Sequence, residues 1–128
     1  MTWYAASVVM WMKKKAAEGV DDHSGPCHVF ENVVIVDAAG PDEAIRKASD
    51  YGTQDAEVNS ADLVVDDQSG EIAFMGVRKL SEIRSLTESG EVQPGDLAEV
   101  TSSELELRSY EDLLEFARGN ALVLRCID

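Results

Sequence analysis

The sequence predicts an α+β protein in which a mostly antiparallel sheet carries two main helices packed on one face. Apolar, β-branched segments recur along the chain, and turn-rich segments separate them. Glycine-rich turns of the kind that lead from a strand into a helix in parallel α/β sheets are missing from the sequence. The expected order is β-β-α-β-β-(α)-β-α-β. The 128 residues fit one domain, with residues 103–128 interpreted as a C-terminal extension.

The first expected strand covers residues 3–12. Trp3, Val8, Val9 and Trp11 are aromatic or β-branched and suit a pleated sheet. Alternation along a strand would place apolar side chains on both of its faces. The strand therefore needs cover on both sides, and a homodimer is one arrangement that would provide it.

The lysines at positions 13–15 bear on targeting. A secretory signal carries its basic residues before the apolar run, and here they follow it. The run is also about half of the roughly 20 residues that a membrane-spanning helix requires. We therefore expect neither an export signal nor a membrane anchor, and we expect a cytoplasmic protein.

A second buried strand, antiparallel to the first, is expected at residues 28–38, and a helix follows it at residues 41–51. Gly40 suits the cap of this helix, and Pro41 suits its first position. Gly52 is expected to end the helix in a left-handed conformation. The predicted apolar stripe consists of Ala44, Ile45, Ala48 and Tyr51.

A hairpin is expected where residues 63–65 and 72–77 flank the turn-rich segment DDQSG. Gly76, inside the second of these runs, suggests a bulge or a close backbone approach. After the hairpin, an apolar spacing predicts a short amphipathic helix. Its apolar residues would be Leu80, Ile83 and Leu86.

The C-terminal part is expected to form a strand, a helix and a last strand. The strand covers residues 97–109, with Leu105 and Leu107 facing inward. Ser109 and Asp112 have the spacing of a helix capping box. The helix would turn Leu113, Leu114 and Ala117 inward and end at Gly119, before a last strand at residues 121–128.

The net charge favours some classes of binding partner and disfavours others. The chain holds 25 Asp and Glu against 11 Lys and Arg, a formal charge of −14. Such a surface repels nucleic acid and anionic membranes, and it favours a basic protein partner. No cofactor is expected. Cys27 and Cys126 are expected to be reduced thiols, and in an oxidising compartment the alternative is one bridge between them.

Several short motifs resemble a small bacterial family, domain of unknown function 4288. The motifs are WYAAS, FENVVIVDA, PDEAIRKA, FMGVRKL and GDLAEVTS, in this order over about residues 3–102. The resemblance implies a small α+β domain and no assigned activity. Among the matching positions, the candidate binding residues are Trp3, Glu31, Gly76 and Glu99.

The loop sequence HSGPCH contains candidate metal ligands. His23, Cys27 and His28 are residue types that zinc accepts. Their spacing matches no standard zinc signature, however, and no second ligand pair follows along the chain. A polar surface loop is the competing interpretation, and we favour it.

Two carboxylates suggest acid–base chemistry. Glu31 lies on the same face of its strand as Val33, and a carboxylate on a buried face can act as an acid or base. A pair of Glu31 and Glu99 in one cleft would suit hydrolysis. The alternative, which we favour, is that Glu31 forms an ion pair with Arg78 or Lys79, or lies at the solvent-exposed end of its strand.

Two function hypotheses follow. The first is a noncatalytic interaction module, similar in size and charge to inhibitor and immunity proteins, which binds a basic protein. The second is a small enzyme or a ligand- or metal-binding domain. It would use Glu31, Glu99 or the His23–His28 loop, and it requires these groups to meet in one pocket.

Overall fold

In the part of the chain that the structure describes, six strands form an antiparallel sheet with one helix on each side. The computed structural model describes residues 2–15, 25–83, 96–97, 99–120 and 125–126. The strand order across the sheet is β3-β4-β1-β2-β5-β6. The α+β class and the antiparallel pairing are confirmed. The strands are β1 (Thr2–Lys14), β2 (Cys27–Ala38), β3 (Val64–Val65), β4 (Gln68–Glu82), β5 (Glu99–Leu107) and β6 (Arg125–Cys126), and the helices are α1 (Pro41–Ser60) and α3 (Tyr110–Ala117).

Strand β1 lies at the centre of the sheet and pairs with β2 on one side and β4 on the other. Its side chains alternate between two buried clusters. Val8 and Met10 belong to the cluster under α1, whereas Val9 and Trp11 belong to the cluster under α3. The expected burial of this strand on both faces is confirmed.

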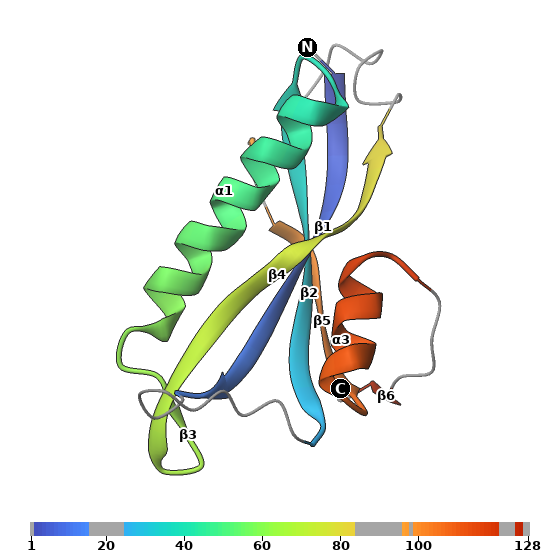
Figure 1. Cartoon of the computed structure of the whole chain (residues 1–128). Helices are drawn as coiled ribbons and strands as arrows, with labels where there is room; N and C mark the ends of the chain where they lie inside the picture. Colours follow the sequence, from blue (N-terminus) through green and yellow to red (C-terminus); the bar gives the residue numbers. More distant parts are fainter. Residues whose placement is uncertain (1, 16–24, 84–95, 98, 121–124, 127–128) are drawn as a thin grey trace.

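The two helices lie on opposite faces of the sheet, so the prediction that both pack on one face is wrong. Ala44, Ala48 and Ala56 of α1 share a cluster with one face of β1, and Leu113 and Phe116 of α3 share a cluster with the other. Figure 1 shows α1 and α3 on either side of the strands. The physical reason is that the central strands are apolar on both faces, and each face loses water only if a helix covers it.

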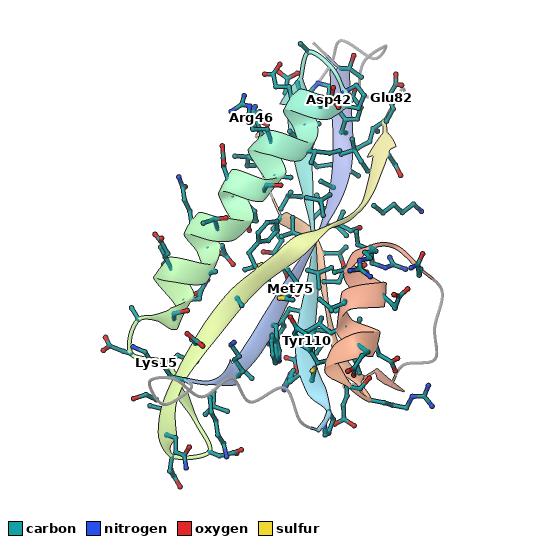
Figure 2. The ribbon with its side chains drawn as sticks, viewed as in Figure 1. Lys15, Asp42, Arg46, Met75, Glu82 and Tyr110 are labelled. Carbon is teal, nitrogen blue, oxygen red and sulfur yellow. The ribbon has the colours of Figure 1, made fainter. Side chains whose placement is uncertain are left out.

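This arrangement bears on the expected homodimer. The dimer was a means of covering the second face of β1, and α3 supplies much of that cover within the chain. Met75 and Tyr110 pack against the same cluster on the α3 side of the sheet, as Figure 2 shows. Within the described residues, no helix is both long and apolar enough to cross a membrane.

Helix α1 continues through Gly52 to Ser60, so the prediction that Gly52 ends the helix is wrong. The buried face of α1 is a row of small residues at every fourth position: Ala44, Ala48, Gly52 and Ala56. Ile45, which was expected on this face, is 43% exposed. The small row lets the helix backbone approach the sheet closely, and the ring of Phe74 occupies the space beside Gly52.

Helix α3 begins as predicted, because the Ser109 hydroxyl accepts a hydrogen bond from the Asp112 N–H at 3.1 Å. Phe116, rather than Leu114, is buried together with Leu113 and Ala117. Strand β5 turns Leu105 and Leu107 into the same cluster, as expected. Of the expected last strand, the structure describes the two residues of β6.

Strand β4 is longer than predicted and takes up part of the expected short helix. Leu80 lies within β4, where it packs against the α1 cluster, and Leu86 lies outside the described residues. The irregularity expected at Gly76 is confirmed, because the register with β1 shifts beside this residue and its φ is +141°. Because of the shift, residues of β4 lie on the same face of the sheet as their partners in β1 on both sides of the irregularity.

The close approach at Gly52 predicts an unusual response to alanine. A Cβ at position 52 would overlap Phe74 Cδ1 and lie 3.0 Å from Val8 Cγ1. We expect Gly52→Ala to lower the free energy of unfolding by about 1–3 kcal/mol through overpacking, although alanine favours helices.

Urea denaturation measures this change. Gln54→Ala, at an exposed position of the same helix, is the control and should change stability by less than about 0.5 kcal/mol. A Gly52→Ala protein at least as stable as the wild type would contradict the proposed contact.

Candidate functional site

The candidate site is a cleft beside α1. The helix packs over β1, β2 and β4, and the next strand, β5, contributes polar side chains. Cross-strand partners share a face of a sheet, so Glu99 and Glu104, which lie opposite Val34 and Phe30, are on the α1 side. A cavity of about 220 Å³ opens here. We call it the acidic cleft, and its lining consists of Met10, Phe30, Asn32, Asp55, Asn59, Ile72 and Glu99.

The acidic cleft combines an apolar floor with a negative rim. Met10 is buried, and Phe30 and Ile72 are half-buried against the α1 cluster. Asp55 comes from the second half of α1, and Glu99 comes from the start of β5. The cleft thus offers two carboxylates above hydrocarbon and an aromatic ring.

Tyr51 links the two carboxylates electrostatically. Its hydroxyl donates a hydrogen bond to Glu99 Oε2 at 3.5 Å. Burial raises the pKa of Tyr51, and the charges of Asp55 and Glu99, together with this hydrogen bond, raise the pKa further. The phenol therefore stays protonated at neutral pH. The charges of Asp55 and Glu99 both act on this one hydroxyl group.

A buried amide lies at the inner side of the cleft. Asn32 is 9% exposed, and its Oδ1 accepts a hydrogen bond from the Ser102 hydroxyl at 2.9 Å. Within the described residues, Asn32 Nδ2 makes no hydrogen bond. Among the described residues, Nδ2 does not belong to the buried polar atoms that lack a partner, so it reaches solvent at the cavity and can donate to water or to a ligand.

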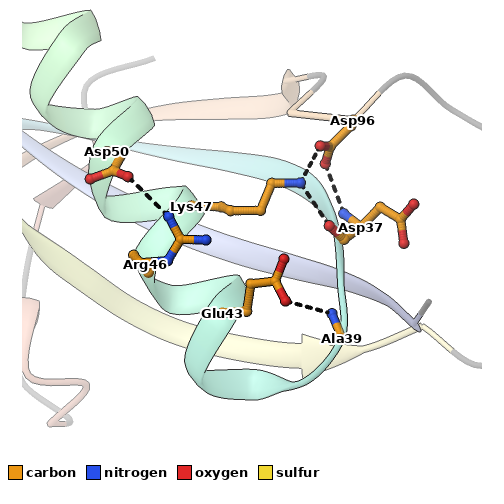
Figure 3. Close-up of polar contacts among 7 residues, drawn as sticks. All are labelled: Asp37, Ala39, Glu43, Arg46, Lys47, Asp50 and Asp96. Atoms are coloured by element: carbon orange, nitrogen blue, oxygen red, sulfur yellow. Dashed lines mark hydrogen bonds and ion pairs between the residues drawn. The ribbon is translucent and has the colours of Figure 1, made fainter.

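A polar clamp at the other end of α1 fixes where β5 begins (Figure 3). Lys47 Nζ donates to Asp96 Oδ2 and to the main-chain oxygen of Asp37, and the Asp37 N–H donates to Asp96 Oδ1 at 2.8 Å. The N–H of Leu97 donates to Ile35 O at 2.6 Å. These contacts hold the chain two residues before Glu99, and they thereby position the carboxylate on the rim.

The clamp shifts the ionisation of Asp96. Its burial opposes ionisation, but the hydrogen bonds from Lys47 and from the Asp37 N–H, with the charge of Lys47, outweigh burial and lower the pKa of Asp96. Asp96 is therefore charged at neutral pH and accepts from both donors.

Glu31 lies on the opposite face of the sheet from Glu99, so the structure does not bring the two carboxylates together. Arg78 Nη1 donates to Glu31 Oε2 at 2.9 Å, and the guanidinium lies 4.6 Å from the ring centre of Phe116 in α3. The expected ion pair of Glu31 with Arg78 is confirmed. This pair fastens the edge of α3 to the sheet.

The candidate metal ligands point to different sides. Cys27 is buried in the α3 cluster, where burial and the charge of Glu111 raise the pKa of its thiol against the effect of Lys13. His28 faces the other side, 3.2 Å from Glu104 Oε2. His23 lies outside the described residues, and among those described no group of three metal-binding side chains forms.

Trp3 and Gly76 serve the sheet and do not line the acidic cleft. Trp3 is half-buried opposite Asp37 on the α3 side of β1, far along the strand from Met10. Gly76 lies opposite Val9, and a Cβ there would lie 3.8 Å from the main-chain oxygen of Ala117. The backbone of β4 at Gly76 therefore packs close to the C-terminal end of α3.

A family model described as "Domain of unknown function (DUF4288)" matches residues 3–93. The chain belongs to this family. The DUF4288 match ends before Glu99, whereas the resemblance in the sequence extended to residue 102. No curated protein and no solved structure was found to match the chain.

The DUF4288 match thus contains most of the acidic cleft, and β5 adds the outer wall. Of the cleft residues, only Glu99 was among the sequence candidates. Asp55 and Asn59 were missed because Gly52 was expected to end α1. Their spacing from Tyr51 was the available signal, since positions i, i+4 and i+8 share one side of a helix.

The lowered pKa of Asp96 predicts a pH effect. The clamp contributes stability above the ordinary pKa of an aspartate, and this contribution is lost as pH falls through the pKa of the folded protein. We expect Asp96→Asn to be less stable than the wild type at neutral pH, and the difference should shrink by roughly pH 2.

Thermal unfolding across this pH range measures the difference. Asp50→Asn is the matched control, since Asp50 pairs with Arg46 on an exposed part of α1. Its difference from the wild type should be small at every pH. An Asp96→Asn deficit that stays constant down to the lowest pH would refute the role of the charged clamp.

The link between Tyr51 and Glu99 predicts a shift that nuclear magnetic resonance can follow. Glu99→Gln removes a negative charge beside the phenol, so the pKa of Tyr51 should fall towards its ordinary value. Glu104→Gln, on the same strand, is the control and should leave the titration unchanged. An unaltered Tyr51 titration in Glu99→Gln would show that the two side chains do not interact.

Proposed function

We propose that this DUF4288 protein is a noncatalytic interaction module that binds a basic protein partner through the α1 side of its sheet. The observation that carries the proposal is the acidic cleft, where Asp55 and Glu99 flank an apolar floor. A concave surface with this charge complements a positive surface and raises the rate of encounter with it.

The charge balance of the whole chain supports this function. Acidic residues exceed basic ones by 14, so the excess cannot be neutralised by ion pairs within the chain. On α1, both basic residues are already engaged, Arg46 with Asp50 and Lys47 with Asp96. The Arg46 side chain is exposed and points outward from α1 (Figure 2).

The enzyme hypothesis has less support. It required Glu31 and Glu99 to meet in one pocket, and they lie on opposite faces of the sheet. Glu31 is already paired with Arg78, which suits a structural role. The free, buried thiol of Cys27 is compatible with a reducing compartment, and we propose the cytoplasm.

A pull-down from cell lysate, read by mass spectrometry, tests the proposal. We expect a basic protein to be retained at roughly 0.05 M salt and released at roughly 0.5 M salt, because screening weakens attraction between surface charges. Absence of any specific partner, or a partner that is retained equally at both salt concentrations, would count against this function.

A further inference from the structure

We propose that the acidic cleft is a binding site for one arginine side chain of the partner. This inference rests on the proposed function and names the chemical group that the site recognises. Three features of the cleft carry it: the two negative charges, the apolar floor with a half-buried aromatic ring, and the amide donor of Asn32.

The carboxylates supply the charge recognition. Asp55 and Glu99 both act on Tyr51, so their negative fields overlap at the rim of one cavity. Neither carboxylate has an ion-pair partner within the described residues, whereas Glu104, further along β5, is paired with His28. A guanidinium has several N–H donors in one plane and can bond to more than one carboxylate at once.

The floor matches the rest of an arginine side chain. Met10 and Ile72 offer hydrocarbon to an aliphatic stem, which gains by leaving water while its charged head stays at the rim. Phe30 adds a π-face on which a guanidinium can stack. The Phe30 ring is held in place by His28, whose ring is stacked on it at 5.3 Å between centroids.

The amide of Asn32 is a further donor that a ligand in the cavity can use, because its Nδ2 reaches solvent there and its Oδ1 is held by Ser102. Asn32 is about nine-tenths buried, lines the cavity and, within the described residues, leaves Nδ2 without an acceptor. A bare cation would not satisfy this donor. A peptide would, because the main-chain carbonyl of an inserted arginine residue can accept from Nδ2.

Titration of the isotope-labelled full chain with the peptide acetyl-Gly-Arg-Gly-amide tests the inference by nuclear magnetic resonance. We expect saturable shifts at the Asn32 side-chain amide and at the main-chain amides of Phe30 and Glu99. The same peptide with citrulline in place of arginine keeps the shape and removes the charge, and it should bind about tenfold more weakly.

Two double variants with equal charge change separate the site from the general acidity of the surface. Asp55→Asn with Glu99→Gln should weaken the arginine peptide about tenfold. Asp67→Asn with Glu111→Gln changes exposed residues outside the cleft and should leave binding within about twofold. Thermal unfolding of both proteins shows whether they remain folded.

Several results would overturn the inference. These are equal binding of the citrulline peptide, equal weakening by both double variants, or shifts induced by calcium chloride that match those of the arginine peptide. If the partner from the lysate keeps its salt-sensitive binding to the Asp55→Asn, Glu99→Gln protein, the arginine site is wrong and the interaction function stands. If the peptide binds as expected and no lysate partner is found, the site stands and the proposed function fails.

Discussion

The burial of β1 on both faces is the constraint on which the rest of this structure depends. Val8 and Met10 lie on one face of this central strand, and Val9 and Trp11 lie on the other. A layer of helix on one face would leave the apolar side chains of the other face in water. Two helices on opposite faces remove both rows from water, and they do so in different ways. Helix α1 approaches closely along a row of small residues, whereas α3 inserts large ones, Leu113 and Phe116.

The acidic cleft follows from that packing. Helix α1 packs over β1, β2 and β4. Its second half therefore lines one side of the cleft, and β5 lines the other. The Lys47–Asp96–Asp37 clamp then fixes where β5 starts, and Glu99 reaches the opposite wall. Two of the carboxylates of the chain, Asp55 and Glu99, thereby line a cavity with an apolar floor, and the proposed binding of one cationic side chain rests on this arrangement.

The parts of the fold that local sequence controls were predicted well. β1, β2 and the Ser109 cap depend on β-branched runs and on a hydroxyl at a fixed spacing, and these signals act within a few residues. The prediction that α1 ends at Gly52 failed because a glycine that ends a helix and a glycine that lets a helix touch a sheet look alike in sequence. Leu80 was misassigned for a related reason, since a short apolar spacing fits both a strand and a helix.

The sequence by itself determined the α+β class, the antiparallel pairing of the first two strands, the DUF4288 family and the acidic character of the chain. It also named Glu99, and it named Arg78 or Lys79 as a partner of Glu31. Only the tertiary structure decided which face each helix covers and which carboxylates share a cavity. Face and proximity depend on packing between segments far apart along the chain, such as α1 and β5, and residue spacing within one segment carries no information about that packing.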